Sequence, residues 1–173
     1  MNDVTIQLLK GNPKKFLDRT IMDRSGSDKV HTRIYFKLPD ETFEVTVWGG
    51  PLKSGMLISY GELPCDLSLG FRMPLTQDQI IRGIDEAIAM ANNRHWYAFL
   101  LLAFDYFLIP TRRFWNWVYR KTGWAPFNGG SDCDCSMAVD RIVKAMGIDL
   151  FPDRAESLTV PGDFEGCPLL EVV

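Results

Sequence analysis

The sequence predicts an α+β fold in one domain, with a small antiparallel sheet packed against helices. Residues 30–38 and 42–48 each alternate apolar and polar side chains, which is typical of strands with one buried face. From Pro74 onward, the apolar residues recur at helical spacing instead. Strands that come first and helices that come later, in a chain of 173 residues, indicate a single α+β domain.

A β-hairpin is the clearest local prediction. Residues 39–41 (Pro-Asp-Glu) are turn formers between the two alternating segments, and the glycine pair at 49–50 ends the second one. A shorter strand is expected over residues 56–60. Residues 65–69 are a weaker candidate, because Pro64 directly before them has no backbone N–H to donate and favours an edge strand or no strand.

Three longer helices are expected after the strands. The first covers residues 77–93, and Thr76 with Gln79 three residues later forms a capping-box pattern at its start. The second is a continuous apolar run over residues 96–109. The third covers residues 135–146, where the apolar positions keep helical spacing and a glycine follows the last residue.

The composition is that of an ordinary soluble globular protein, with 46% hydrophobic and 24% charged residues. A net charge of −3 argues against a general nucleic-acid binder, which would usually be basic. Residues 1–5 lack the basic and then apolar pattern of a secretory signal, so a cytoplasmic or virion-associated protein is expected. Residues 96–109 are too short to span a bilayer comfortably and include Asp105, so no transmembrane segment is predicted.

The four cysteines are expected to be reduced thiols, because no export signal is visible. A single residue separates Cys133 from Cys135, whereas zinc sites usually place about two to four residues between the first pair of ligands. The chain has only two histidines. The sequence therefore predicts neither a metal site nor a cofactor, and it disfavours a cysteine-based metal or redox module.

Cys135 is the strongest candidate for chemistry, because it opens a helix. A cysteine in the first turn faces unpaired backbone N–H groups and the positive end of the helix dipole, and both favour the nucleophilic thiolate. Cys135 also lies on the apolar stripe of its own helix, so a small buried hydrophobic residue is the alternative. Asp132 and Asp134 beside it would oppose a thiolate, but as helix N-cap residues they need no functional explanation.

A nucleophilic cysteine needs a general base, and only His31 and His95 are available. His31 begins the first strand of the hairpin and shares a polar face with Arg33, Tyr35 and Lys37. Such a face, turned towards a helix N-terminus, would form one wall of a site. The alternative is that His31 is one more solvated residue on that face.

The order of these motifs resembles the circularly permuted papain-like enzymes of the NlpC/P60 superfamily, in which the histidine strand precedes the cysteine helix. The matching segments are short, and their order and spacing carry the resemblance. They are Val30–Tyr35, Pro74–Gln79, Trp96–Tyr97, Cys135–Ser136, Gly147–Leu150 and Thr159–Asp163. The resemblance implies a permuted papain-like core over residues 30–173, preceded by an N-terminal extension over residues 1–29.

The resemblance also implies a cysteine hydrolase, a peptidase or amidase, that cleaves amide bonds through a thioester. Cys135 would be the nucleophile and His31 the general base, and the backbone N–H of Cys135 would help to form an oxyanion hole. Tyr97 matches an aromatic position that lines the site of the family, and a core aromatic is the alternative. The implied substrate is a peptide or amide, either a cell-wall peptide of peptidoglycan or a lipid-linked acyl chain.

The third catalytic residue of the family is a carboxylate near the end of the second hairpin strand. Glu44 is the only acid on that strand, but it comes two or three residues early, and Thr46 lies nearer the expected place. With a two-residue turn at residues 40–41, Glu44 would pair with Lys37, on the His31 face but far from His31, and with a three-residue turn it would lie on the other face. This poor match supports the alternative of a non-catalytic structural or binding protein with the same fold, for example a phage virion component.

A basic and aromatic stretch over residues 112–121 has no place in the implied active site. It could meet a membrane surface, an acyl chain or a partner protein. The alternative is a half-buried helix whose arginines extend along apolar surface to reach water.

Overall fold

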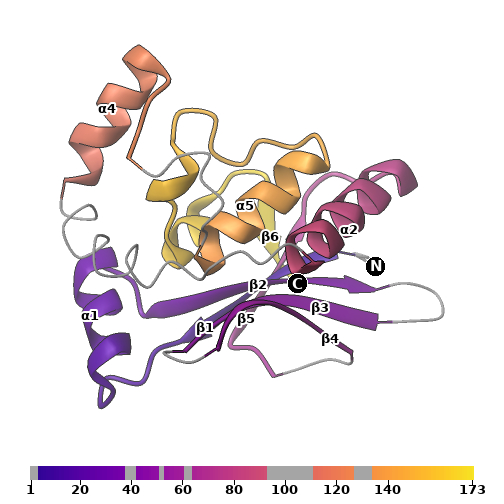
Figure 1. Cartoon of the computed structure of the whole chain (residues 1–173), viewed down its shortest axis with the longest axis horizontal. Helices are drawn as coiled ribbons and strands as arrows, with labels where there is room; N and C mark the ends of the chain where they lie inside the picture. Colours follow the sequence, from indigo (N-terminus) through magenta and orange to yellow (C-terminus); the bar gives the residue numbers. More distant parts are fainter. Residues whose placement is uncertain (1–3, 38–41, 51–52, 61–63, 93–110, 127–133) are drawn as a thin grey trace.

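The structure is a computed structural model of the chain. It describes residues 4–37, 42–50, 53–60, 64–92, 111–126 and 134–173. Within these residues, helices cover one face of an antiparallel sheet (Figure 1). The predicted α+β class is confirmed.

The sheet has six strands in the order β4-β3-β2-β1-β5-β6, and every neighbouring pair is antiparallel. The strands are β1 (Val4–Lys10), β2 (Lys29–Lys37), β3 (Thr42–Gly50), β4 (Lys53–Tyr60), β5 (Leu67–Phe71) and β6 (Leu170–Val172). Strands β2 and β3 confirm the predicted hairpin, and β4 contains the predicted strand at 56–60. The weaker candidate at 65–69 overlaps β5, which lies between two neighbours and is not an edge strand.

The register of the hairpin differs from the one expected for a two-residue turn at residues 40–41. Lys37 pairs with Thr42 and Tyr35 pairs with Glu44, so the predicted pairing of Glu44 with Lys37 is wrong. The observed register aligns apolar residues across the two strands, for example Phe36 with Phe43. Such cross-strand pairs decide the register where one face of the sheet is buried.

Strand β1 lies in the middle of the sheet, between β2 and β5. The resemblance implies that residues 1–29 are an extension outside the core, but the side chains of Val4, Ile6 and Leu8 are fully buried. These three residues alternate with Thr5 and Gln7, so the segment has the period of a strand with a core face. Residues 4–10 therefore belong to the core, and helix α1 (Phe16–Ser25) connects them to β2.

Three further helices are described: α2 (Gln77–Asn92), α4 (Arg112–Thr122) and α5 (Cys135–Ala145). The predicted capping box of α2 is confirmed, because the backbone N–H of Gln79 donates to Thr76 Oγ1 at 3.3 Å and that of Thr76 donates to Gln79 Oε1 at 3.0 Å. The predicted third helix is confirmed as α5, and Gly147 follows it with a φ of 82°. The helix predicted over residues 96–109 lies outside the described residues.

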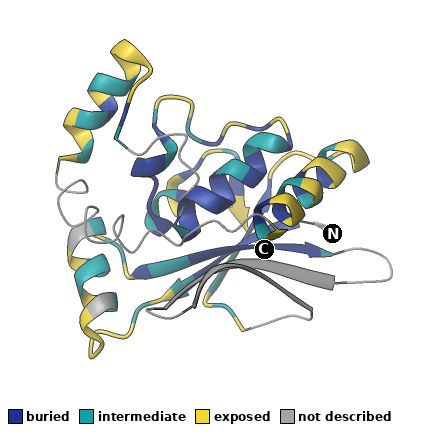
Figure 2. Ribbon diagram, viewed as in Figure 1, coloured by how far each residue is buried: buried dark blue, intermediate teal, exposed yellow. Residues whose placement is uncertain are grey.

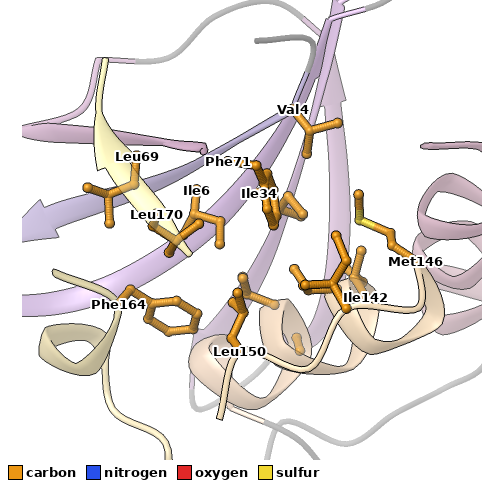
Figure 3. Close-up of a cluster of buried hydrophobic side chains, with 14 of the residues drawn as sticks. Val4, Ile6, Ile34, Leu69, Phe71, Ile142, Met146, Leu150, Phe164 and Leu170 are labelled. Carbon is orange, nitrogen blue, oxygen red and sulfur yellow. The ribbon is translucent and has the colours of Figure 1, made fainter. Parts of the chain in front are cut away.

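Helix α5 lies over the sheet and supplies much of the core (Figures 2 and 3). Its buried Met137, Ile142 and Val143 belong to the same cluster as Ile34 and Phe36 of β2. Two short 3-10 helices, η1 (Glu156–Leu158) and η2 (Pro161–Gly166), complete this layer. In the parts of the chain that the structure describes, no helix has both the length and the apolar character that are needed to cross a bilayer.

Candidate functional site

The first turn of α5 is built as the sequence predicts. Asp134 is the N-cap residue, and its Oδ1 accepts a hydrogen bond of 2.8 Å from the backbone N–H of Met137. This bond satisfies one of the N–H groups that a helix start leaves unpaired. Cys135 is the next residue, so the cap fixes it in the first turn.

The Cys135 thiol lies where the start of α5 meets the start of β2. It interacts with the backbone of Thr32 and with Ser136, and only 6% of the residue is exposed. The hydroxyl oxygens of Thr32 and Ser136 are 3.5 Å apart, which places a second contact between the same two segments. The ladder between β2 and β3 has its last pair at Arg33 and Thr46, so Thr32 lies just beyond it. The thiol therefore contacts β2 at the residue where its pairing with β3 has ended.

His31 is the chain neighbour of Thr32, and it is half-buried. The side chain of Thr32 reaches Ser136 of α5. Because successive strand residues point to opposite faces, the Cβ of His31 leaves β2 on the face away from α5. The structure thus brings the backbone at His31 close to Cys135, and the expected contact between the imidazole and the sulfur stays a prediction.

Two residues that share a face of β2 with His31 are buried and not solvated. Arg33 and Tyr35 are 5% and 8% exposed, respectively. The guanidinium of Arg33 donates to Gln7 Oε1 at 2.9 Å and to the carbonyl oxygen of Pro64 at 2.6 Å. The alternative that the sequence left open, a solvated polar face, is therefore wrong for these positions.

The environment of Cys135 opposes ionisation of its thiol. Burial is the largest cause and the negative charge of Asp134 the second, and together they raise the pKa of Cys135 to about 12. Hydrogen bonds from Thr32 and Ser136 act in the opposite direction but are weaker. The expectation that the helix start would favour the thiolate is therefore wrong for this structure, because desolvation of a charge outweighs the helix dipole.

The acid and base groups next to this thiol are also shifted. Burial, and then the positive charge of Arg33, lower the pKa of His31 to about 4. Burial raises the pKa of Asp134 to about 6, against hydrogen bonds from the backbone of Met137 and Ser136. At neutral pH, the site thus holds a neutral imidazole and a protonated thiol beside an ionised carboxylate.

Glu44, the predicted third catalytic residue, is not brought to this site. Glu44 stands opposite Tyr35 in the sheet, four positions along β2 from His31. At about 3.3 Å per residue, this separation is roughly 13 Å, which is too long for a direct hydrogen bond between the two side chains. Thr46, opposite Arg33, is two positions nearer. Tyr97 lies outside the described residues.

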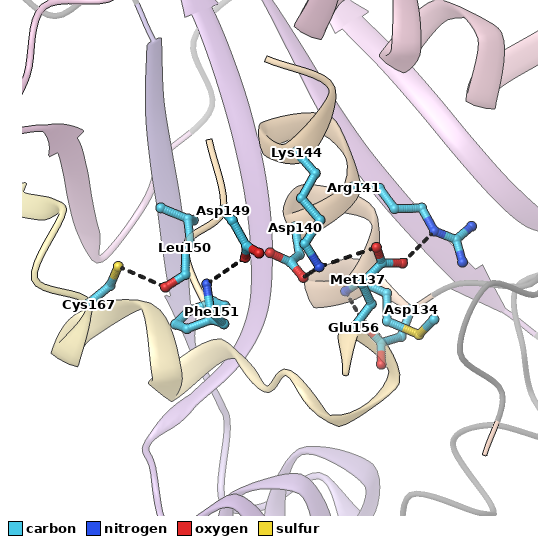
Figure 4. A network of polar contacts seen from close by, with 10 residues as sticks. All are labelled: Asp134, Met137, Asp140, Arg141, Lys144, Asp149, Leu150, Phe151, Glu156 and Cys167. Atoms are coloured by element: carbon cyan, nitrogen blue, oxygen red, sulfur yellow. Dashed lines mark hydrogen bonds and ion pairs between the residues drawn. The ribbon is translucent and has the colours of Figure 1, made fainter. Parts of the chain in front are cut away.

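A buried ionic network lies one to three turns along α5, and the sequence reasoning missed it (Figure 4). Asp140 is 0% exposed, and its Oδ2 is 3.2 Å from Lys144 Nζ. Lys144 also lies 3.3 Å from Glu156, and Arg141 lies 3.0 Å from the same carboxylate. The sequence does carry a signal for this network. Asp140 and Lys144 stand four residues apart, the spacing at which side chains on one helix face meet. The network ties η1 to α5, so we interpret it as structural.

The C-terminal segment that resembles the family, Thr159–Asp163, also has a structural role. The Asp163 carboxylate accepts a hydrogen bond of 2.9 Å from the backbone N–H of Val160. It also receives the guanidinium of Arg112 at 3.0 and 3.1 Å and forms an ion pair with Arg154. These contacts hold the start of α4 against η2.

Among the described residues, no group of three or more histidine, cysteine, aspartate or glutamate side chains could hold a metal ion. The described cysteines, Cys65, Cys135 and Cys167, are free thiols. No protein-family model matches the sequence, and no match is found among curated proteins. The resemblance to the NlpC/P60 superfamily therefore depends on the order of the motifs alone.

Proposed function

We propose that the protein is a thiol hydrolase with a permuted papain-like fold, in which Cys135 attacks an amide bond and His31 accepts the thiol proton. One observation supports this proposal above the others. The Cys135 thiol interacts with the backbone of Thr32, the residue directly after His31, across more than a hundred residues of sequence. The resemblance implies that the helix which begins with the cysteine packs beside the strand that carries the histidine, and the contact at Thr32 supports this part of it.

The reaction would proceed through a thioester. The Cys135 sulfur bonds to the carbonyl carbon while its proton moves to the His31 imidazole, and the backbone N–H of Cys135 donates to the developing oxyanion. The imidazolium then protonates the leaving amine, and the C–N bond breaks. Water, deprotonated by the neutral imidazole, hydrolyses the thioester and restores the thiol. We propose a cell-wall peptide as the substrate class, with a lipid-linked amide as the second.

A neutral imidazole with a pKa near 4 is present in the form that accepts a proton, but it is a weak base for a thiol whose pKa is near 12. Proton transfer between them is strongly unfavourable in the unliganded protein. The proposal therefore requires that substrate binding alters this environment, so that transfer accompanies the attack on the carbonyl carbon.

The same pKa values favour a second candidate function. A thiol that is buried and protonated has the character of an inert core residue, and Glu44 is too far along the sheet to orient His31. A protein with this site would bind or assemble without catalysis, for example as a virion component.

Reaction with a thiol-directed electrophile separates the two candidates, and Cys167 is a matched internal control. Cys135 and Cys167 are 6% and 5% exposed, and burial is the largest cause that raises the pKa of each. For a hydrolase, we expect iodoacetamide to modify Cys135 faster than Cys167, as followed by peptide mass spectrometry. His31→Ala should slow the reaction of Cys135 and leave that of Cys167 unchanged.

A hydrolysis assay on cell-wall peptides completes the test. Cys135→Ala should abolish release of the amine product, and Cys167→Ala should retain it. Equal alkylation rates at the two cysteines, no effect of His31→Ala and no hydrolysis would together support the non-catalytic candidate.

A further inference from the structure

One face of helix α4 gathers exposed aromatic and basic side chains. These residues follow helical spacing, so they lie along one side of α4 and its C-terminal end. We call them the aromatic-basic face, and they are Arg113, Phe114, Trp117, Arg120, Lys121 and Trp124. The three aromatic residues are 55%, 58% and 57% exposed. Large aromatic side chains are usually buried, so three of them exposed on one face require an explanation.

The opposite side of α4 is already packed, and this fixes the direction of the exposed face. Trp115 and Tyr119 pack against a small buried cluster of Ala125, Ala155 and Leu158. At the start of the helix, Arg112 is held by the Asp163 carboxylate. Helix α4 thus packs Trp115 and Tyr119 against this small cluster. The aromatic residues of the aromatic-basic face do not take part in that packing.

The exposed aromatic rings contact one another and the ring of Trp115. Phe114 and Trp117 stack with centroids 6.2 Å apart and planes inclined by 29°. Trp115 makes edge contacts with Phe114 at 5.1 Å and with Trp124 at 5.8 Å. Because Trp115 is anchored in the packed side, these contacts give the exposed rings a defined arrangement before any partner binds.

The charge on α4 is opposite to that of the protein as a whole. The helix carries Arg112, Arg113, Arg120 and Lys121 and no acidic residue, whereas the chain has a net charge of −3. Arg112 is paired with Asp163, and the other three belong to the aromatic-basic face. In Figure 1, α4 stands at one end of the molecule, apart from the sheet. Since charges separated by more than about 10 Å are largely screened at physiological salt, the local positive charge decides what this face attracts.

We propose that the aromatic-basic face binds the surface of a lipid bilayer that contains anionic head groups. Tryptophan and phenylalanine are side chains that enter the boundary between head groups and acyl chains, and arginine and lysine beside them attract anionic lipids. A second copy of the same face is a poor partner, because a two-fold interface would place like charges opposite one another. The proposal concerns binding at the membrane surface and does not depend on the proposed hydrolase activity.

Vesicle sedimentation tests this proposal directly. The whole protein is mixed with vesicles of phosphatidylcholine alone or with vesicles that contain an equal part of phosphatidylglycerol, at low salt. We expect binding to the anionic vesicles to be at least about tenfold tighter than to the neutral ones, with a shift of tryptophan emission to shorter wavelength. Raising the salt to about 0.5 M should weaken binding by screening the basic residues.

Two variants of the face and one control separate membrane binding from a general effect on the fold. Phe114→Ala with Trp117→Ala, and separately Arg113→Gln with Arg120→Gln, should each weaken binding to anionic vesicles by about tenfold or more. The control is Ile81→Ala with Ile88→Ala, which removes two exposed apolar side chains from α2 (47% and 42% exposed) and should leave binding unchanged. All four positions on the face are exposed, so these variants are expected to fold.

Three results would overturn the proposal. The first is equal binding of the protein to neutral and anionic vesicles, or to neither. The second is undiminished binding by both variants of the face. The third is a dimer in sedimentation velocity that Phe114→Ala with Trp117→Ala dissociates, because the face would then be a protein interface.

Discussion

The hydroxyl oxygens of Thr32 and Ser136 lie 3.5 Å apart, although 104 residues separate them in the sequence. This contact joins the first turn of α5 to the start of β2. The two residues are the chain neighbours of His31 and Cys135, so any chemistry between the histidine and the cysteine depends on how these two segments are held together. The contact also shows why the thiol is buried, since a helix N-terminus that packs on a strand excludes water from its first turn.

The charge of Asp134 is the part of this environment that is easiest to change. Asparagine caps a helix about as well as aspartate, so Asp134→Asn should keep the start of α5 intact. Because the Asp134 charge raises the pKa of the Cys135 thiol, we expect that pKa to fall in the variant. The rate of alkylation of Cys135 near pH 8 should increase roughly three- to tenfold, since the thiolate population changes tenfold per pKa unit. Mass spectrometry of the modified peptide measures this rate.

Cys167 in the same variant is the control for this measurement. The charge that raises the pKa of Cys167 is that of Asp140 and not that of Asp134, so its alkylation rate should not change. An unchanged rate at Cys135 would show that burial alone suppresses the thiolate.

Replacing Cys135 or Cys167 with alanine should reduce the stability of the protein by similar amounts. Both belong to the main hydrophobic cluster, so Cys135→Ala and Cys167→Ala should each lower the free energy of unfolding by on the order of 1 kcal/mol. Urea denaturation of the two variants measures this loss. A much smaller loss for Cys135→Ala would indicate that its thiol sits at the rim of the core and not within it.

The elements with a regular period were predictable from the sequence, because each buries one face. Strands β2 and β3 and helices α2 and α5 show the alternation or the helical spacing that burial imposes. Strand β1 has the same alternation, but the segments that resemble the family begin at Val30, so the resemblance places residues 4–10 in an extension outside the core. Its place between β2 and β5 follows from pairing between distant segments, which local patterns do not specify.

The local structure around Cys135 was predictable from the sequence, but its electrostatics were not. The helix start at Cys135 and the cap at Asp134 are local, and both are confirmed. The pKa of the thiol depends on burial under β2, which only the tertiary structure determines. The register that separates Glu44 from His31 likewise depends on which residues pair across the hairpin.

Asp140 should make the stability of the protein depend on pH. Burial raises its pKa from 3.8 to about 6, so the folded state holds the proton more tightly than the unfolded state. Its contribution to the free energy of unfolding is therefore fully present below about pH 4 and is lost as the pH rises through about 6. In Asp140→Asn this contribution is absent. We expect the difference in unfolding free energy between pH 4 and pH 7 to change by on the order of 2–3 kcal/mol relative to the original protein.

Chemical denaturation at the two pH values measures this change. The expected direction of the change is definite. The original protein should lose more unfolding free energy than Asp140→Asn when the pH rises from 4 to 7. Identical differences in the two proteins would mean that Lys144, 3.2 Å away, compensates fully for the burial of the carboxylate.

The packing of α2 against α5 depends on a glycine. A Cβ at Gly83 would lie 2.8 Å from Met146 Cγ and 3.3 Å from the ring of Phe36, so a larger residue there must displace the core. Alanine favours a helix over glycine by up to about 1 kcal/mol, but overpacking of a core costs roughly 1–3 kcal/mol. We expect Gly83→Ala to lower the midpoint of urea denaturation. Gly166→Ala is the matched control, because a Cβ at that glycine meets nothing within 4 Å and its φ is not in the left-handed region. If Gly83→Ala were as stable as Gly166→Ala or more so, Met146 would have to move aside at no cost, and the close contact between α2 and α5 would not contribute to stability.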